Sequence, residues 1–125
     1  MPYERLEDKR VYQHAEVLAD RVWQIVTCWN WFAQKTVGCQ WVDATDSIGA
    51  NVAEASGRFH ANDVKKFLYY ARGSLRESKY WLRRALAREL VSPADATDLD
   101  QQLEYLSSEV NAAINFQKRR NDKPD

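Results

Sequence analysis

Residues 47–88, SIGANVAEASGRFHANDVKKFLYYARGSLRESKYWLRRALAR, carry the clearest structural pattern in the chain. In their second half, apolar residues recur at steps of three and four from Val64 to Leu86, which is the spacing of one face of an α-helix. In their first half the same rhythm runs from Ile48 up to Gly57, whose backbone suits a left-handed helix end. This stretch therefore predicts two long helices joined by a short turn.

The same periodicity extends to both sides of this stretch. Asn30, a residue that tolerates a left-handed backbone, marks an earlier turn, and Ser92 followed by Pro93 is typical of a helix start. A chain of 125 residues with four Gly and three Pro has room for one core and few turns. We therefore expect one all-α domain over residues 1–125, an antiparallel up-down-up-down four-helix bundle. Its helices are predicted at about 8–27, 33–55, 63–90 and 93–118.

Charge is distributed unevenly along a chain whose net charge is zero. The segment 58–88 holds nine basic and two acidic residues, a net charge of +7, whereas the segment 92–110 holds five acidic residues and no Lys or Arg. The third predicted helix is thus basic and the fourth is acidic. This asymmetry indicates that the charged surfaces bind a partner or form a contact between copies of the chain.

Five cations of the third helix fall within a sector roughly 60° wide when residues are placed about 100° apart. Cations at this spacing could follow a phosphate backbone and release its condensed counterions. The flanking Tyr69 and Tyr80 could stack on unpaired bases. The alternative is a solvated face that the acidic fourth helix of a neighbouring copy partly neutralises. The candidate nucleic-acid contacts are Lys65, Arg72, Arg76, Lys79 and Arg83.

Polar residues of the second helix favour a structural role over catalysis. Asp43 and Glu54 would lie about 16 Å apart along a helix, too far to share one reaction centre, whereas a carboxylate paired with Arg72 could fix the helix register. His14 and His60 fall in different elements and no Glu is followed three positions later by His, so no metal or other cofactor is expected. The chain is therefore not expected to be an enzyme. The expected structural polar network comprises Ser47, Asn51, Glu54, Arg72 and Glu77.

Aromatic residues exceed what a four-helix core of this size readily holds. Of five Trp, only Trp41 and Trp81 fall on or near the predicted apolar seams. The surplus near one end of the bundle, with tyrosines beside the basic residues, is typical of an interface, so we expect self-association. The candidate interface residues are Trp29, Trp31, Phe32, Tyr69 and Tyr80.

The sequence also favours a location away from membranes. No apolar run approaches the roughly 20 residues of a membrane span, and the segment 1–10 lacks the apolar core of a signal peptide. Cys28 and Cys39 do not form a Cys-x-x-Cys pair, and we expect them to be reduced thiols in the core. These features predict a cytoplasmic protein without membrane contact.

Two motifs resemble the bacterial four helix bundle protein family, which is also called the ribosomal S23 or intervening-sequence protein family. The family pattern is approximately S-I-x-x-N-I-A-E-G, then a short basic turn, then F-L-x-x-A-x-G-S-x-x-E. The string DSIGANVAEASGRF is similar to the first half, and KKFLYYARGSLRESKYWL is similar to the second. The matching residues are Ser47, Ile48, Asn51, Ala53, Glu54, Phe67, Leu68, Ala71, Gly73, Ser74, Leu75 and Glu77.

This resemblance implies a four-helix bundle that assembles into a barrel-like homopentamer and has no enzymatic activity. Some members of the family are encoded within intervening sequences of large-subunit ribosomal RNA genes. Others are accessory variability determinants of diversity-generating retroelements, which bind nucleic acid and a reverse transcriptase. We therefore expect a self-assembling accessory factor that binds RNA or DNA or joins a ribonucleoprotein. The alternative is a homo-oligomeric protein-interaction scaffold without nucleic-acid binding.

Overall fold

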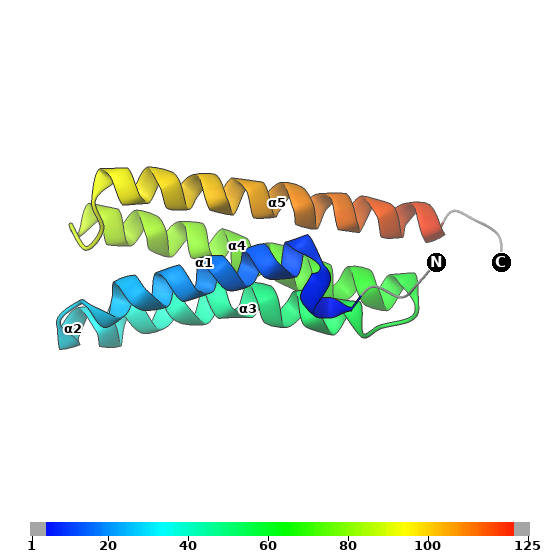
Figure 1. Cartoon of the computed structure of the whole chain (residues 1–125), viewed down its shortest axis with the longest axis horizontal. Coiled ribbons are helices and arrows are strands. Elements are labelled where there is room, and N and C mark those ends of the chain that lie inside the picture. Colours follow the sequence, from blue (N-terminus) through cyan, green and yellow to red (C-terminus); the bar gives the residue numbers. More distant parts are fainter. Residues whose placement is uncertain (1–4, 122–125) are drawn as a thin grey trace.

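The computed structural model describes residues 5–121, and every regular element in that part of the chain is helical (Figure 1). A 3₁₀ turn, η1 (Leu6–Asp8), precedes α1 (Arg10–Thr27). The second long helix consists of α2 (Trp31–Ala33), a π-helical turn η2 (Gln34–Gly38) and α3 (Cys39–Ser56) in direct succession. The last two long helices are α4 (Ala61–Ala87) and α5 (Pro93–Asn121). The all-α four-helix bundle predicted from the sequence is confirmed.

The long helices alternate in direction, as the short connections predict. Figure 1 shows both chain ends at one end of the bundle and the α1–α2 and α4–α5 turns at the other. α1 packs on α3 and α5, and α4 packs on the same two helices. The bundle therefore has four seams between neighbouring helices, and the α1/α3 seam lies opposite the α4/α5 seam.

The apolar stripes seen in the sequence form one continuous core. Leu18 of α1, Ile48 of α3, Leu75 of α4 and Leu103 of α5 are all essentially inaccessible to water. Burying a side chain of this size contributes about 1.5–3 kcal/mol, so the stripes supply most of the driving force for helix association. None of the helices in the described part is long and apolar enough to cross a membrane.

The first turn is built by caps on both helix ends and not by a left-handed residue. Asn30 has φ −67° and ψ 163°, which is extended backbone, and its side-chain oxygen accepts a hydrogen bond from the Ala33 backbone N–H at 3.0 Å. The Gln34 amide donates to the carbonyl oxygens of Val26 and Thr27, at 3.2 and 3.1 Å, and so satisfies the free end of α1. Because Asn30 is an N-cap, the second helix begins at residue 31 and not near 33.

The two later turns also differ in detail from the sequence predictions. Gly57 has φ −85°, so the helix that ends at Ser56 does not need a left-handed glycine. The left-handed residue is Glu89, with φ 59°, and it stops α4 at Ala87 before the predicted end near 90. The predicted start of α5 is confirmed, since the Ser92 hydroxyl oxygen accepts a hydrogen bond from the backbone N–H of residue 95 at 3.1 Å.

Both cysteines are free, but the prediction that they lie in the core is wrong. Cys28 is the C-cap of α1 and Cys39 opens α3, and both side chains are exposed. Neither position falls on the buried stripe of its helix. The small size of the cysteine side chain does not by itself indicate whether it points into the core or toward solvent.

Candidate nucleic-acid interface

The five cations predicted as phosphate contacts lie on α4, along the side of that helix that faces α5. We call Lys65, Arg72, Arg76, Lys79 and Arg83 the α4 stripe. Their register on the α4/α5 seam is fixed by contacts from both helices, because Lys79 pairs with Glu104 and the Arg72 guanidinium donates to the side-chain oxygen of Asn111 at 3.4 Å.

Two members of the α4 stripe are therefore held by the fold. Lys79 is half-buried and its charge is balanced by Glu104. Arg72 is held between Asn111 and the ring of Tyr69, with the guanidinium carbon 4.8 Å from the ring centroid. Among residues 5–121, the remaining members of the stripe have no ion pair with a carboxylate. These members are Lys65, Arg76 and Arg83.

Aromatic rings alternate with these three cations along α4. Tyr69 is 37% exposed and Tyr80 is 53% exposed, and both project within about 60° of the unpaired cations around the helix. Tyr80 is held in place by edge-on contact with Trp81, whose centroid lies 4.9 Å away. This face therefore combines unpaired cations with exposed aromatic rings.

The expected polar network between α3 and Arg72 does not form within this chain. The Ser47 hydroxyl donates to the Asp43 carbonyl at 2.7 Å, the Asn51 amide donates to the Ser47 carbonyl at 2.9 Å, and both bonds stay inside α3. Glu54 pairs with Arg58 at 3.1 Å. Arg72 faces α5, whereas Glu77 is five residues further on and therefore projects about 140° away around α4.

Most acidic residues of α5 pair with side chains of other helices in the same molecule. Arg21 of α1 pairs with both Asp95 and Asp98, and Glu104 pairs with Lys79 of α4. The carboxylate of Glu109 lies 2.7 Å from Nδ1 of His14 in α1. These contacts tie α5 to its two neighbours. The helix that the sequence indicated as an acidic docking surface thus holds its own bundle together.

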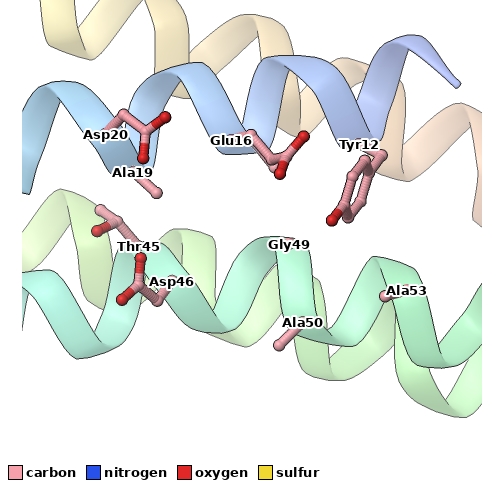
Figure 2. A pocket seen from close by; sticks show the side chains of 10 residues that line it. Tyr12, Glu16, Ala19, Asp20, Thr45, Asp46, Gly49, Ala50 and Ala53 are labelled. Atoms are coloured by element: carbon pink, nitrogen blue, oxygen red, sulfur yellow. The ribbon is translucent and has the colours of Figure 1, made fainter. Parts of the chain in front are cut away.

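A separate acidic surface lies on the α1/α3 seam. A hollow of about 250 Å³ opens there over small side chains of both helices. Figure 2 shows Glu16 and Asp20 on the α1 side of this hollow and Asp46, Gly49 and Ala50 on the α3 side. We call this feature the α1/α3 groove. Its lining residues are Tyr12, Ala15, Glu16, Ala19, Asp20, Thr45, Asp46, Gly49, Ala50 and Ala53.

Burial and neighbouring carboxylates raise the pKa of two groups in the α1/α3 groove. Partial burial raises the pKa of Asp46 above its ordinary value, and the negative charges of Asp20 and Asp43 raise it further. The pKa of Tyr12 is raised chiefly by the charge of Glu16. The α1/α3 groove is therefore electrostatically negative, because several carboxylates lie close together there.

The α1/α3 groove is not visible when charge is counted helix by helix, because its carboxylates come from two helices. A signal was present, since Glu16 and Asp20 are four residues apart and Asp43 and Asp46 are three apart, and each pair shares one helix face. Because the α1/α3 seam is opposite the α4/α5 seam, the molecule has an acidic face and a basic face. Only the pairing of helices in the fold makes this arrangement visible.

The predicted aromatic interface divides into two groups. Trp31 and Phe32 are 69% and 67% exposed beside the first turn, and Tyr69 and Tyr80 are exposed on α4. Trp29 instead closes the end of the core, where its ring stacks on Trp41 with centroids 5.9 Å apart and its indole N–H donates to the Leu90 carbonyl at 3.0 Å. Trp29 is thus a structural residue of this bundle end.

No three His, Cys, Asp or Glu side chains within residues 5–121 are grouped so that they could hold a metal ion. The two histidines are separated, since His14 bonds Glu109 on the α1/α5 seam while His60 precedes α4 and meets Phe59 edge-on at 5.2 Å.

The fold and its seams define the chain as a protein of the four-helix bundle class. The model of the 23S rRNA-intervening sequence protein family matches residues 7–112. The chain therefore belongs to the 23S rRNA-intervening sequence protein family, as the motifs in residues 47–88 indicated.

The fold is shared with a solved structure. The chain is similar to the crystal structure of a protein with unknown function from the S23 ribosomal protein family of Bacteroides thetaiotaomicron, with a TM-score of 0.76 and 19% sequence identity. The similarity covers 84% of this chain and 95% of that one. At this identity the likeness shows a common fold. No curated protein matches the sequence.

Proposed function

We propose that the protein is a non-enzymatic accessory factor that binds single-stranded nucleic acid through α4. The observation that carries this proposal is the row of unpaired Lys65, Arg76 and Arg83 with Tyr69 and Tyr80 exposed beside them. Membership of the 23S rRNA-intervening sequence protein family supports RNA as the first nucleic acid to test. The cytoplasm, where such RNA is found, is the proposed location.

The physical basis is counterion release together with stacking. Three cations that neutralise phosphates of a single strand predict a slope of roughly −2 for log affinity against log salt concentration. Between about 50 and 200 mM salt, that slope corresponds to roughly a twentyfold loss of affinity. Each base stacked on a tyrosine ring adds about 1–3 kcal/mol and is largely independent of salt.

The test is the fluorescence anisotropy of labelled single-stranded and hairpin RNA at low and near-physiological salt. The double variant Arg76→Glu with Arg83→Glu should weaken binding by at least about tenfold, because it replaces two phosphate contacts by repulsion. The matched control is Lys66→Glu with Arg84→Glu, which makes the same charge change on α4 about 100° away from the stripe. Equal losses in both variants would show that only net charge matters and would reject the stripe.

A second candidate function is a homo-oligomeric scaffold, and the opposite charges of the two faces support it. The acidic α1/α3 groove of one copy could receive the basic α4 stripe of the next. Such a contact joins two different surfaces, so it is head-to-tail, and it closes into a ring when the rotation between copies permits. A pentamer is the ring size that the family resemblance implies.

Light scattering on the same variants separates the two functions. If α4 binds nucleic acid, Arg76→Glu with Arg83→Glu should weaken RNA binding by at least about tenfold and leave the oligomer intact. If α4 is a subunit contact, the same variant should break the oligomer, and Asp20→Lys with Asp46→Lys in the α1/α3 groove should break it as well. An intact oligomer with unchanged RNA binding in both double variants would reject both assignments.

A further inference from the structure

A second cationic site lies at the end of the bundle where both termini are found. A pocket of about 280 Å³ opens there between the ends of α1, α3, α4 and α5. Its floor is aliphatic, because core residues such as Val52, Val64 and Leu68 line it. Its polar lining consists of Lys9, Ser56, Arg58, Gln117 and Arg120. No carboxylate among the described residues lines this pocket.

Two of the three cations are oriented by neutral groups. The Lys9 ammonium donates to the Ser56 hydroxyl at 3.0 Å. The Arg120 guanidinium donates to the Phe59 carbonyl at 3.1 Å and to the Gln117 side chain at 2.7 Å. Within residues 5–121, neither Lys9 nor Arg120 has an ion pair with a carboxylate. These hydrogen bonds fix both side chains without cancelling their charge.

The third cation differs from these two. Arg58 is paired with Glu54 at 3.1 Å, and its guanidinium also lies 4.6 Å from the centroid of the Phe67 ring. Its charge is therefore balanced locally. The uncompensated charge of the pocket is about two units, and it sits above an apolar floor that screens it less than water would.

Two uncompensated cations match a phosphate monoester better than a phosphodiester. A monoester carries about −1.5 to −2 charges near neutral pH, whereas each phosphodiester of a nucleic-acid backbone carries one.

An exposed aromatic residue follows Arg58 of the pocket in the sequence and contacts Arg120 of the pocket through its backbone. Phe59 lies in the turn between α3 and α4 and is 80% exposed, and its own carbonyl accepts the hydrogen bond from Arg120. A ring in this position can stack on the base attached to a phosphate in the pocket. On α4, Lys65 follows Val64 of the pocket floor, so the α4 stripe begins next to the pocket.

We propose that this pocket binds the terminal phosphate of a single-stranded nucleic acid, with Phe59 stacked on the terminal base. The following nucleotides then run along the α4 stripe. Binding of the strand rests on the function proposed above, and recognition of its end is the new element. Lys9 and Arg120 hold the phosphate, and Arg58 is a structural residue of the turn.

The experiment compares three versions of one internally labelled single-stranded RNA, with a 5′-phosphate, with a 3′-phosphate and with hydroxyl groups at both ends. Anisotropy is measured at low salt. We expect one phosphorylated form to bind at least about tenfold more tightly than the hydroxyl form, as for hydrogen bonds to a charged group. Added inorganic phosphate should reduce this preference by competing for the pocket.

The variant Lys9→Gln with Arg120→Gln should remove the preference for the phosphorylated end. The matched control is Lys35→Gln with Arg88→Gln, which removes the same charge at the opposite end of the bundle and should keep the preference. Lys9 and Arg120 also form hydrogen bonds near helix ends, so their replacement also removes structural contacts. Phe59→Ala therefore provides a second variant, because the Phe59 ring is exposed and lies outside the core. It should reduce the binding of the preferred RNA severalfold.

The possible outcomes separate this inference from the function on which it rests. If all three RNAs bind equally and Lys9→Gln with Arg120→Gln changes nothing, end recognition is rejected while strand binding on α4 remains. If no RNA binds at low salt, both are rejected. A preference that survives in Lys9→Gln with Arg120→Gln would place the phosphate elsewhere and also overturn the assignment.

Discussion

Gly38 occupies a position where even a methyl group has no room. It lies in the π-helical turn η2 against α1, and a Cβ built on it would be 2.7 Å from a methyl carbon of Val26 and 3.1 Å from the carbonyl oxygen of Ala33. We expect Gly38→Ala to lower the free energy of unfolding by about 1–3 kcal/mol, the usual cost of overpacking. Urea unfolding measures this change.

Gly73 provides the matched control in α4. A Cβ there would meet nothing within 4 Å, so Gly73→Ala should gain about 0.5–1 kcal/mol from the better helix propensity of alanine. If both substitutions stabilise the protein, the Val26 side chain moves aside easily and the close approach at Gly38 carries no energetic weight.

Asp46 should make stability depend on pH in a predictable direction. Burial, with the charges of Asp20 and Asp43, raises its pKa above the ordinary value of 3.8 in the folded state only. The folded protein thus binds the proton more tightly than the unfolded chain, and stability falls as pH rises through the window that begins at 3.8. Asp46→Asn should therefore raise the melting temperature at neutral pH, and the gain should disappear in acid below 3.8.

Asp100→Asn is the control for Asp46→Asn, because it removes an exposed carboxylate of α5 that does not line the α1/α3 groove. Its effect on stability should stay within about 0.5 kcal/mol. A gain for Asp46→Asn that is no larger than that of the control, or one that persists unchanged in acid, would show that the groove does not penalise the Asp46 charge.

At the scale of the helix, the N-cap of α5 can be tested with two serines of similar exposure. Ser92 accepts a hydrogen bond from a backbone N–H of the first turn, whereas the Ser108 hydroxyl donates to the Glu104 carbonyl inside the same helix. Ser92→Ala should cost about 1 kcal/mol because an N–H loses its partner. Ser108→Ala should be close to neutral, since that carbonyl remains free to accept from the helix backbone. Equal melting temperatures for the two variants would contradict the cap.

Helices were predictable from the sequence where burial alone determines the pattern. The apolar steps from Val64 to Ala85 reflect one buried stripe, so α4 and its direction of packing follow from local sequence. Leu86, which the spacing also placed on this stripe, is 39% exposed. The π-helical turn η2 was not predictable in this way. Its Gly38 lies close to Val26 of another helix, and such a contact leaves no mark in the periodicity.

The candidate site was predictable only in part, for a related reason. The shared face of the α4 stripe follows from spacing within one helix. The pairing of Lys79 with Glu104 and the contact of Arg72 with Asn111 depend on the register between α4 and α5, which no single helix specifies. The same holds for the pocket at the terminal end, where Lys9, Arg58 and Arg120 come from distant parts of the sequence.

For the whole molecule, the arrangement of charge matters more than its total. The net charge is zero, but the acidic α1/α3 groove and the basic α4 stripe lie on opposite seams of the bundle. A protein with such faces can attract a polyanion to one side, and it can also attract its own copies in a head-to-tail orientation. Nucleic acid and a neighbouring copy would then compete for α4, so RNA should dissociate oligomers if the scaffold contact exists.

A charge-swap experiment tests the head-to-tail contact directly. Arg76→Glu with Arg83→Glu places two acidic residues in the α4 stripe, and Asp20→Lys with Asp46→Lys places two basic residues in the α1/α3 groove, so each variant reverses the charge at the two positions that would meet. If the α4 stripe meets the α1/α3 groove, neither variant should associate alone, because like charges then oppose each other. An equimolar mixture should associate again in alternating order, which light scattering measures at low salt. Failure of the mixture to associate, when both chains are folded, would exclude this contact and leave the α4 stripe to nucleic acid.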